Sequence, residues 1–442
     1  MDTRWKRMIE TCGILLILPG LGFGFFGVIG MAVIVVALAY RNDSSAALYN
    51  IAILTAIALT FGAGVVTTWH AQKSLKGKPS GALRLPPLVV MLGSFVVLIL
   101  IGLAMIDRKF LPALFLPPIF LMLVALPPLW AVSWFTPRKT PGETDHISAP
   151  ASQLSWRRGL VAFCGGATVS VFLALVLEIS ISATVLSLIS NAAQTVLNGF
   201  SGLFSGISGS ASFARALTDP FFIYFFVEVT VIAPLVEELV KPLVTLPLLR
   251  QLNRQETFWV GALAGAGFAT IENILYAGGG FSIWAGILLV RALGGALHPL
   301  GSGLVALGWR DVLLGKPKAF ENWFKQYGLA VLIHALWNGG SLLVITLGSA
   351  GIFGVLPASI DILGLSMAGT TFVFLLLLGI AALWLGRAYG HNRTLQVVPE
   401  TEGDSASDAG YTLSERATAL WALACLLALV PIGIAGLRLW LR

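Results

Sequence analysis

Charged side chains are scarce in this chain. Asp, Glu, Lys and Arg make up 11% of its 442 residues, and 57% of the residues are apolar, whereas a soluble domain carries about 25% charged residues. Several runs of about 18 or more residues contain no ionisable group, which is long enough to cross a hydrocarbon core of about 30 Å. The scarcity of charge excludes an ordinary soluble domain and predicts an integral membrane protein.

Cysteine is also rare, and no basic segment is interleaved with aromatic residues. Cys12, Cys164 and Cys425 lie far apart within apolar runs, where they form neither a CxxC pair nor a metal-binding spacing. The net charge of +7 comes from Lys and Arg residues, most of which lie in short connections between apolar runs and set orientation in the membrane. We therefore expect no nucleic-acid partner.

The fold class that hydropathy predicts is all-α, a polytopic transmembrane helical bundle of about eleven spans. Most of the 28 Lys and Arg residues fall in the connections on one side, which predicts a cytoplasmic N-terminus and an extracytoplasmic C-terminus. The first apolar run is longer than a signal-peptide core, and we interpret it as a retained span. The candidate spans are 11–40, 48–69, 88–106, 110–135, 159–187, 221–249, 260–277, 281–307, 327–348, 365–386 and 417–437.

Two polar stretches divide the chain. They contain too little apolar surface to order themselves, and we interpret both as cytoplasmic linkers. The predicted units are four leading spans in 1–136, a linker in 137–158, a central transmembrane core in 159–348, a tenth-span region in 349–386, a polar linker in 387–416 and a last span in 417–442.

A small set of ionisable groups lies within the predicted spans. Such a group costs a few kcal/mol at the bilayer centre, so it usually faces a cavity and has a task. All but Glu178 fall between residues 221 and 348, which predicts that the functional site lies there. The groups are Glu178, Glu228, Glu237, Glu238, Glu272, His298 and His334.

The sixth span carries two adjacent glutamates and a lysine. Glu237 and Lys241 are four residues apart and share a helix face, whereas Glu238 is rotated by about 100°. Pro234 and Pro242 bracket these residues, and each proline removes a backbone donor and loosens the helix. A structural ion pair would explain Glu237 and Lys241, but it does not explain the second acid.

The next three spans each add polar residues. In the seventh, Gly261 and Gly265 permit close approach of a neighbouring helix, which we expect to bring Glu272 towards the sixth span. In the eighth and ninth, His298 and His334 are the central groups. A single buried histidine is more often a satisfied hydrogen-bonding group, but two on adjacent spans beside three glutamates favour a site. At 1.5 Å per residue, these groups lie from mid-membrane into the inner half.

Two further pairs flank the histidines. Arg291 and His298 are seven residues apart and lie on one stripe of the eighth span, while His334 and Asn338 are four apart and share a face of the ninth. Both pairs would point into the same polar cavity.

Two chemistries fit such a cavity. A glutamate can take a proton from water while an imidazole or amide stabilises the oxyanion, which suits amide hydrolysis. Alternatively, His298, His334 and one glutamate, Glu272, hold zinc and leave a position for water. The chain has no HExxH sequence, and the residues leave both alternatives open.

Four motifs, one in each of four consecutive spans, resemble those of the PrsW-type intramembrane proteases, distant relatives of the CAAX prenyl endopeptidases. The resemblance covers about residues 160–348 and does not reach the four leading or the last two spans. The motifs are Glu237-Glu238-Leu-Val-Lys241 (EExxK), Phe268-Ala-Thr-Ile-Glu272-Asn273 (FxxxEN), His298, and His334 with Asn338.

The resemblance implies a membrane-embedded peptidase that cuts membrane-anchored regulators such as anti-sigma factors. Glu237 or Glu238 would be the general base and Glu272 a second acid. His298 and His334 would stabilise the oxyanion or bind a metal. The implied supporting residues are Lys241, Asn273, Arg291 and Asn338, the last orienting His334.

The same resemblance implies partners, location and cofactor. The partners are a membrane-anchored protein substrate and the lipid bilayer, and the location is the plasma (inner) membrane of a prokaryote. Members of the family have been called metalloproteases, whereas the CAAX relatives resemble glutamate-dependent enzymes. A divalent metal such as zinc is therefore an open alternative.

Two other functions are compatible with intramembrane Glu, Lys and His. A proton- or ion-coupled transporter would need such residues, although the chain shows no internal repeat of the kind on which many transporters are built. A non-catalytic membrane scaffold would retain its function after replacement of the glutamates.

Overall fold

The structure is a computed structural model of the full chain. The residues that it describes are 83–106, 119–136, 154–188, 220–250, 252–279, 283–342, 360–367 and 369–391, together with isolated positions from 73 to 81. The predicted spans 11–40, 48–69 and 417–437 lie outside the described residues.

The described part of the chain is mostly helical, 86%, which confirms the all-α prediction apart from one short hairpin. Strands β1 (Ile360–Ile362) and β2 (Leu365–Met367) pair in antiparallel register. The helices are α3 (Leu88–Ile106), α5 (Phe120–Phe135), α6 (Trp156–Gly165), η2 (Gly166–Ser170), α7 (Val171–Leu188), α10 (Pro220–Val227), η3 (Glu228–Ile232), α11 (Ala233–Val240), η4 (Lys241–Thr245), α12 (Leu246–Leu249), α13 (Arg254–Gly279), α14 (Trp284–Leu293), α15 (Leu297–Leu313), α16 (Ala319–Ala335), η6 (Leu336–Gly340) and α18 (Gly369–Gly390).

Five described helical stretches are long and apolar enough to cross a membrane. Each overlaps a span that hydropathy predicts, and the total of about eleven spans stays a prediction. The stretches are Leu88–Ile106, Trp156–Ser182, Arg254–Ala277, Trp284–Leu313 and Gly369–Gly390.

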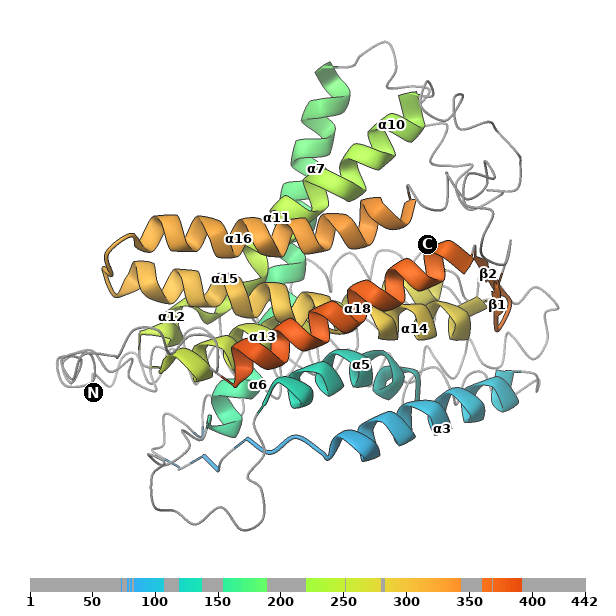
Figure 1. The fold of residues 1–442 in the computed structure, drawn as a ribbon, viewed down its shortest axis with the longest axis horizontal. Coiled ribbons are helices and arrows are strands. Elements are labelled where there is room, and N and C mark those ends of the chain that lie inside the picture. Colours follow the sequence, from blue (N-terminus) through green and yellow to red (C-terminus); the bar gives the residue numbers. More distant parts are fainter. Residues whose placement is uncertain are drawn as a thin grey trace.

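Helix α13 lies at the centre of the bundle and is almost entirely buried. Helix α15 packs against it, α16 and α18 each lie along α15, and α7 and α10 project from the bundle (Figure 1). Gly261 and Gly265 lie against α15, because a Cβ on Gly265 would come within 2.2 Å of the His298 carbonyl oxygen. The neighbour that these glycines admit is therefore the eighth span, not the sixth as expected.

A second glycine contact joins α13 to the helix formed by α6 and η2. A Cβ on Gly166 would lie 1.9 Å from the Ala264 carbonyl oxygen, and one on Gly267 would lie 1.9 Å from that of Phe163. The two backbones are thus in direct contact, which any side chain at either glycine would prevent.

The helices that carry the site are irregular. Around Pro234 and Pro242 the sixth span changes from the π-helix η3 through α11 to the 3₁₀-helix η4, which confirms the predicted loosening. The eighth span is interrupted between α14 and α15, where residues 294–296 form turns. Such interruptions inside a membrane occur where the backbone is buried in protein or lines a polar cavity.

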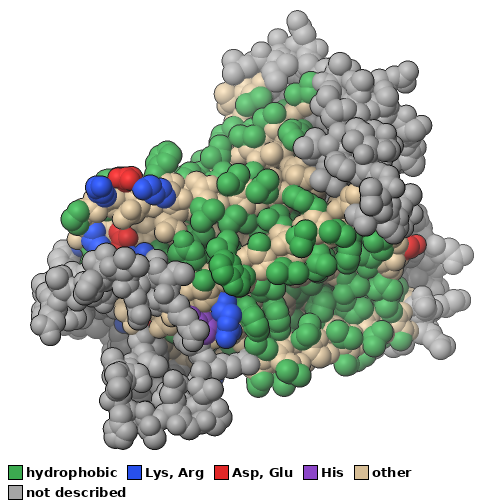
Figure 2. All heavy atoms as spheres, viewed as in Figure 1, with side chains coloured by type: hydrophobic (Ala, Val, Ile, Leu, Met, Phe, Trp, Pro, Cys, Tyr) green, Lys and Arg blue, Asp and Glu red, His purple; other side chains and the backbone are tan. Residues whose placement is uncertain are grey.

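One end of the described molecule carries charged and aromatic side chains. Hydrophobic side chains cover much of the visible face, and Lys, Arg and acidic side chains gather at one end, over the connection between α15 and α16 (Figure 2). Trp323 on α16 packs against Trp309 and Tyr327, with ring centroids 5.1 and 5.2 Å apart. Tryptophan and tyrosine are enriched where a membrane protein meets the water interface.

Candidate functional site

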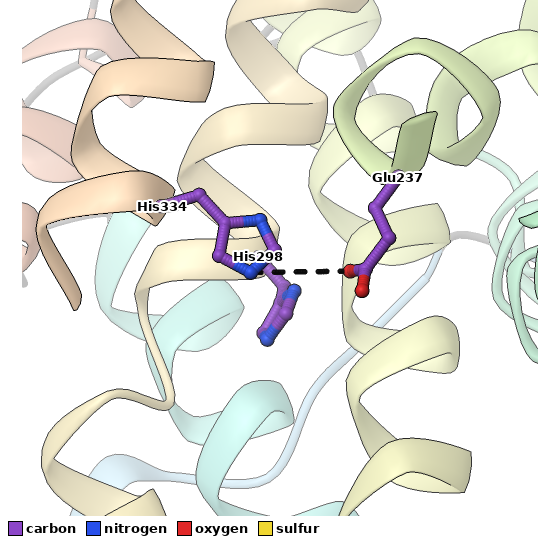
Figure 3. Close-up of side chains that lie close together, drawn as sticks. All are labelled: Glu237, His298 and His334. Atoms are coloured by element: carbon purple, nitrogen blue, oxygen red, sulfur yellow. Dashed lines mark ion pairs between the residues drawn. The ribbon is translucent and has the colours of Figure 1, made fainter. Parts of the chain in front are cut away.

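One side chain from each of three helices points towards the same position inside the bundle. Glu237 on α11, His298 on α15 and His334 on α16 face one another (Figure 3), and one ligand-type atom from each lies within 4.8 Å of the others. All three residues are buried. This set, called here the Glu237–His298–His334 group, unites three of the predicted site residues from three separate spans.

Lys241 connects the group to its surroundings. Its Nζ lies 2.8 Å from Glu237 Oε2, 2.8 Å from Glu238 Oε1 and 2.7 Å from His298 Nδ1. An ammonium has three donors, so these three acceptors satisfy it, and the ring of Phe268 lies 4.6 Å from Nζ. The expected pair of Glu237 and Lys241 is confirmed, and it is extended to Glu238 because a helical turn of three or four residues brings both acids over the same lysine.

Glu238 holds His334. His334 Nδ1 donates to Glu238 Oε1 at 2.9 Å, since a carboxylate can only accept. This bond leaves Nε2 of the ring towards Glu237, whose Oε2 lies 4.0 Å away. Glu238 itself is 1% exposed, and its Oε2 lies against Gly301, where a Cβ would approach it to 2.3 Å.

Glu272 holds His298 in the same way. His298 Nε2 lies 3.0 Å from Glu272 Oε2, while Nδ1 accepts from the Lys241 ammonium. An imidazole that donates at one nitrogen and accepts at the other is the neutral tautomer. Each histidine of the group is therefore oriented by a carboxylate of its own.

Arg291 extends this network along α13. Its Nη2 lies 3.0 Å from Glu272 Oε2, its Nε donates to Asn273 Oδ1, and its guanidinium carbon lies 4.4 Å from the Tyr276 ring. Asn273 in turn donates from Nδ2 to the Val124 carbonyl at 2.9 Å. The predicted supporting residues Arg291 and Asn273 thus bind Glu272 and each other.

Asn338 is the predicted site residue that the structure places differently. Its Nδ2 donates to the Val229 carbonyl at 3.2 Å, so it joins η6 to η3 and does not orient His334. The partner of His334 is Glu238. The expectation failed because η6 is a π-helix, whose wider turn changes the face on which a residue four positions after His334 lies.

Family comparison agrees with this geometry. Residues 155–378, which include all the helices of the site, match the profile described as PrsW family intramembrane metalloprotease. The chain belongs to this family. Among curated proteins and solved structures, none matches the chain.

As a PrsW family protein, the chain is a peptidase that acts in a membrane. The family assignment confirms the resemblance seen in the four motifs and favours proteolysis over the transporter and scaffold alternatives. The matched residues extend past the predicted core to the first half of α18.

The donor set of this PrsW family site suits a divalent metal. Two imidazoles and one carboxylate are a known catalytic zinc set, and a carboxylate on the far nitrogen of each histidine is the usual second partner of a metal-binding imidazole. The third member is Glu237 and not the expected Glu272, because Glu272 binds His298 and Arg291 instead. For His298 Nδ1 to bind an ion, the Lys241 ammonium has to leave that nitrogen for the glutamates.

Two residues near the site were not singled out from sequence. Gly301 provides the space for the Glu238 carboxylate, and Trp337 lies against the break between α14 and α15. Gly301 belongs to a glycine-rich stretch in which no pattern distinguishes one glycine from the next. Trp337 follows His334 by three residues, so helical spacing could have placed it on the same face.

Proposed function

We propose that this PrsW family protein hydrolyses peptide bonds of membrane-anchored regulatory proteins, anti-sigma-factor-like in kind, and that Glu237 takes the proton of the attacking water. Support comes from the partners of the three acids. Glu238 and Glu272 each hold a histidine at 2.9 and 3.0 Å, whereas Glu237 pairs with Lys241 and its nearest histidine nitrogen, His334 Nε2, lies 4.0 Å away. Glu237 is therefore the acid that is not occupied in orienting a histidine.

His334 is suited to move the proton onward. Its Nδ1–H is fixed on Glu238, so Nε2 faces Glu237 with a lone pair. In the proposed reaction the water oxygen bonds to the scissile carbonyl carbon, and its proton passes to Glu237. The proton then reaches the leaving nitrogen through His334 as the C–N bond breaks. Glu238 stabilises the imidazolium that exists between these steps.

Lys241 and Glu272 act by position. The Lys241 ammonium is 2.8 Å from both Glu237 and Glu238, so it offsets the negative charge of two adjacent acids in a medium of low dielectric constant. Glu272 fixes the ring of His298 and pairs with Arg291. In this proposal neither Lys241 nor Glu272 exchanges a proton with the substrate.

Glu237, His298 and His334 would also hold a divalent ion. Such an ion would act as a Lewis acid at the scissile carbonyl and make a water molecule more acidic. With an ion bound, Glu238 and Glu272 would keep their roles of orienting His334 and His298.

The proposal is tested with purified protein in liposomes that contain co-expressed single-span proteins. Glu237→Gln and His334→Ala should each lower the cleavage rate by about 10²–10⁴-fold, the usual contribution of general acid–base catalysis. Glu321→Gln is the matched control, since Glu321 forms an exposed ion pair on the same helix as His334. Wild-type rates in both site variants would contradict the proposal.

Metal dependence has its own measurement. Elemental analysis of the purified protein, and of Glu237→Gln and His334→Ala, shows whether an ion is bound and whether it is lost with these side chains. Full activity after chelation, with no bound ion, would assign the reaction to the glutamate alone.

A further inference from the structure

A hollow lies directly beside the Glu237–His298–His334 group. It is open to the outside and its enclosed part has room for about one water-sized group, and Arg291, Asn273, Gly294, Gly295, His298 and Trp337 contribute to its lining. Because His298 belongs both to the lining and to the group, one imidazole ring separates the hollow from the atoms that would act on a peptide bond.

We propose that this hollow is the subsite for the substrate residue next to the scissile bond, in which Arg291 binds a backbone carbonyl and Trp337 admits small side chains only. The inference rests on the proposed hydrolysis and deepens it, because it names what the substrate must present. An extended peptide advances about 3.3–3.6 Å per residue, so a bond held at the group places a neighbouring residue in the hollow.

Arg291 offers a donor that the protein does not use. Nη2 is engaged by Glu272 and Nε by Asn273, while among the described residues Nη1 has no partner. The hollow thus presents a donor to an incoming chain. A substrate segment unwound for cutting exposes carbonyls that find no water in the hydrocarbon region, and Nη1–H can donate a hydrogen bond to one of them.

The charge around Arg291 selects the kind of acceptor. Glu272 already neutralises the guanidinium at 3.0 Å, and Glu237 and Glu238 add two further negative charges against the single Lys241. A carboxylate in the hollow would therefore meet net repulsion. A neutral backbone carbonyl meets none, so acidic residues should be poor at this position.

Trp337 limits the size of the side chain. A Cβ on Gly294 would lie 2.5 Å from Trp337 Cζ2, which shows that the indole rests on the bare backbone of the break between α14 and α15. Trp337 lies in η6, which follows directly on the end of α16 that carries His334. A large substrate side chain would have to occupy the volume that the indole fills.

The decisive comparison is the side-chain preference of Trp337→Ala against the wild type. Both are reconstituted in liposomes with a library of single-span peptides in which six central residues are randomised, and cut sites are identified by mass spectrometry. Wild-type cuts should be flanked by Gly, Ala or Ser. Trp337→Ala should cut next to Leu or Phe at least about tenfold more often relative to Ala. Trp384→Ala is the matched control, since Trp384 lies on α18 with 69% of its surface exposed, and it should keep the wild-type preference.

Each result separates the subsite from the proposed reaction. Normal cutting by Trp337→Ala with the wild-type preference would overturn the subsite alone. Absence of any cut by the wild type would contradict the hydrolysis and the subsite with it. If Trp337→Ala is inactive, the side-chain preference of Trp337→Phe, whose ring is smaller, is compared with that of the wild type instead. If both variants fold and both are inactive, the proposal that Trp337 selects by size is wrong.

Arg291→Lys tests the carbonyl contact. Lysine keeps the positive charge beside Glu272 but lacks the second arm of the guanidinium. On a peptide that the wild type cuts, KM should rise by about tenfold with a smaller change in kcat. An unchanged KM would overturn the contact, and acidic residues at the flanking position should remain poor for both proteins.

Discussion

At the scale of single residues, the site depends on small spaces as much as on charges. Lys241 is fully buried, and it is tolerated because three acceptors surround it. A buried charge that loses its partners costs several kcal/mol. The same crowding applies to Glu238, whose second oxygen is confined against the backbone of α15. Its position, and through it that of His334, is set by the lack of a side chain at Gly301.

Gly301→Ala should therefore damage catalysis without removing any charged group. The new methyl group would lie 2.3 Å from Glu238 Oε2, so the carboxylate has to move and His334 loses its orientation. Loss of a residue that orients a site histidine typically costs about 10–100-fold in activity. The rate of substrate cleavage measures this effect.

Gly328→Ala is the control for that substitution. Gly328 lies on α16, and a Cβ there meets nothing within 4 Å. Alanine in an exposed helix position is favoured over glycine by about 1 kcal/mol, so this variant should keep its activity and its stability. Equal activity of the two variants would show that Gly301 is not part of the support of Glu238.

At the scale of elements, the site is built where helices depart from regular geometry. The π-helices η3 and η6 pack against each other, with Gly339 against Thr230 and Asn338 bound to the Val229 carbonyl. A π-turn leaves carbonyls without their usual helical donors and is frequent at functional sites. The Asn338 side chain of η6 therefore supplies a donor to a backbone carbonyl of η3, that of Val229.

Asn338→Leu should destabilise the protein by about 1–3 kcal/mol, because the Val229 carbonyl would remain unpaired in an apolar surrounding. The free energy of unfolding in mixed detergent micelles is the measurement. Asn322→Leu, at an exposed position of α16, should change it little. If both variants are equally stable, the bond between η6 and η3 contributes nothing to folding.

The sequence predicted the elements better than their details. Hydropathy located each of the five described spans, because a run of about twenty apolar residues is long enough to cross a membrane. The motifs selected residues that the structure brings together, and their catalytic roles stay a prediction. The role of Asn338, the neighbour of Gly261 and Gly265, and the third member of the group were wrong. These three features depend on where π-turns occur and on which helices pack together. The spacing of residues in a regular helix of 3.6 residues per turn gives neither.

At the scale of the whole molecule, orientation in the membrane stays a prediction from charge. The asymmetry of Lys and Arg places the N-terminus and both polar linkers in the cytoplasm. Single cysteines in a chain without Cys12, Cys164 and Cys425 test this with a membrane-impermeant thiol reagent. Ser148→Cys and Ser405→Cys should react only after intact cells are permeabilised.

Ser205→Cys provides the opposite arm of that experiment. It lies in the predicted outer connection after the fifth span and should react in intact cells. Labelling of Ser148→Cys from outside would reverse the orientation. If Ser148→Cys and Ser405→Cys were labelled from opposite sides, the number of spans between the two linkers would be odd and not even as predicted.

The aromatic cluster at the start of α16 has a consequence for how targets are chosen. Trp323 and His334 are carried by one uninterrupted helix, so about 16 Å separate them at 1.5 Å per residue. If the indole rings lie at the lipid headgroups, His334 lies at a fixed depth of about 16 Å below the membrane surface. Substrates would then have in common a small residue at that depth in the membrane, and proteins of unrelated sequence that have one would be cut.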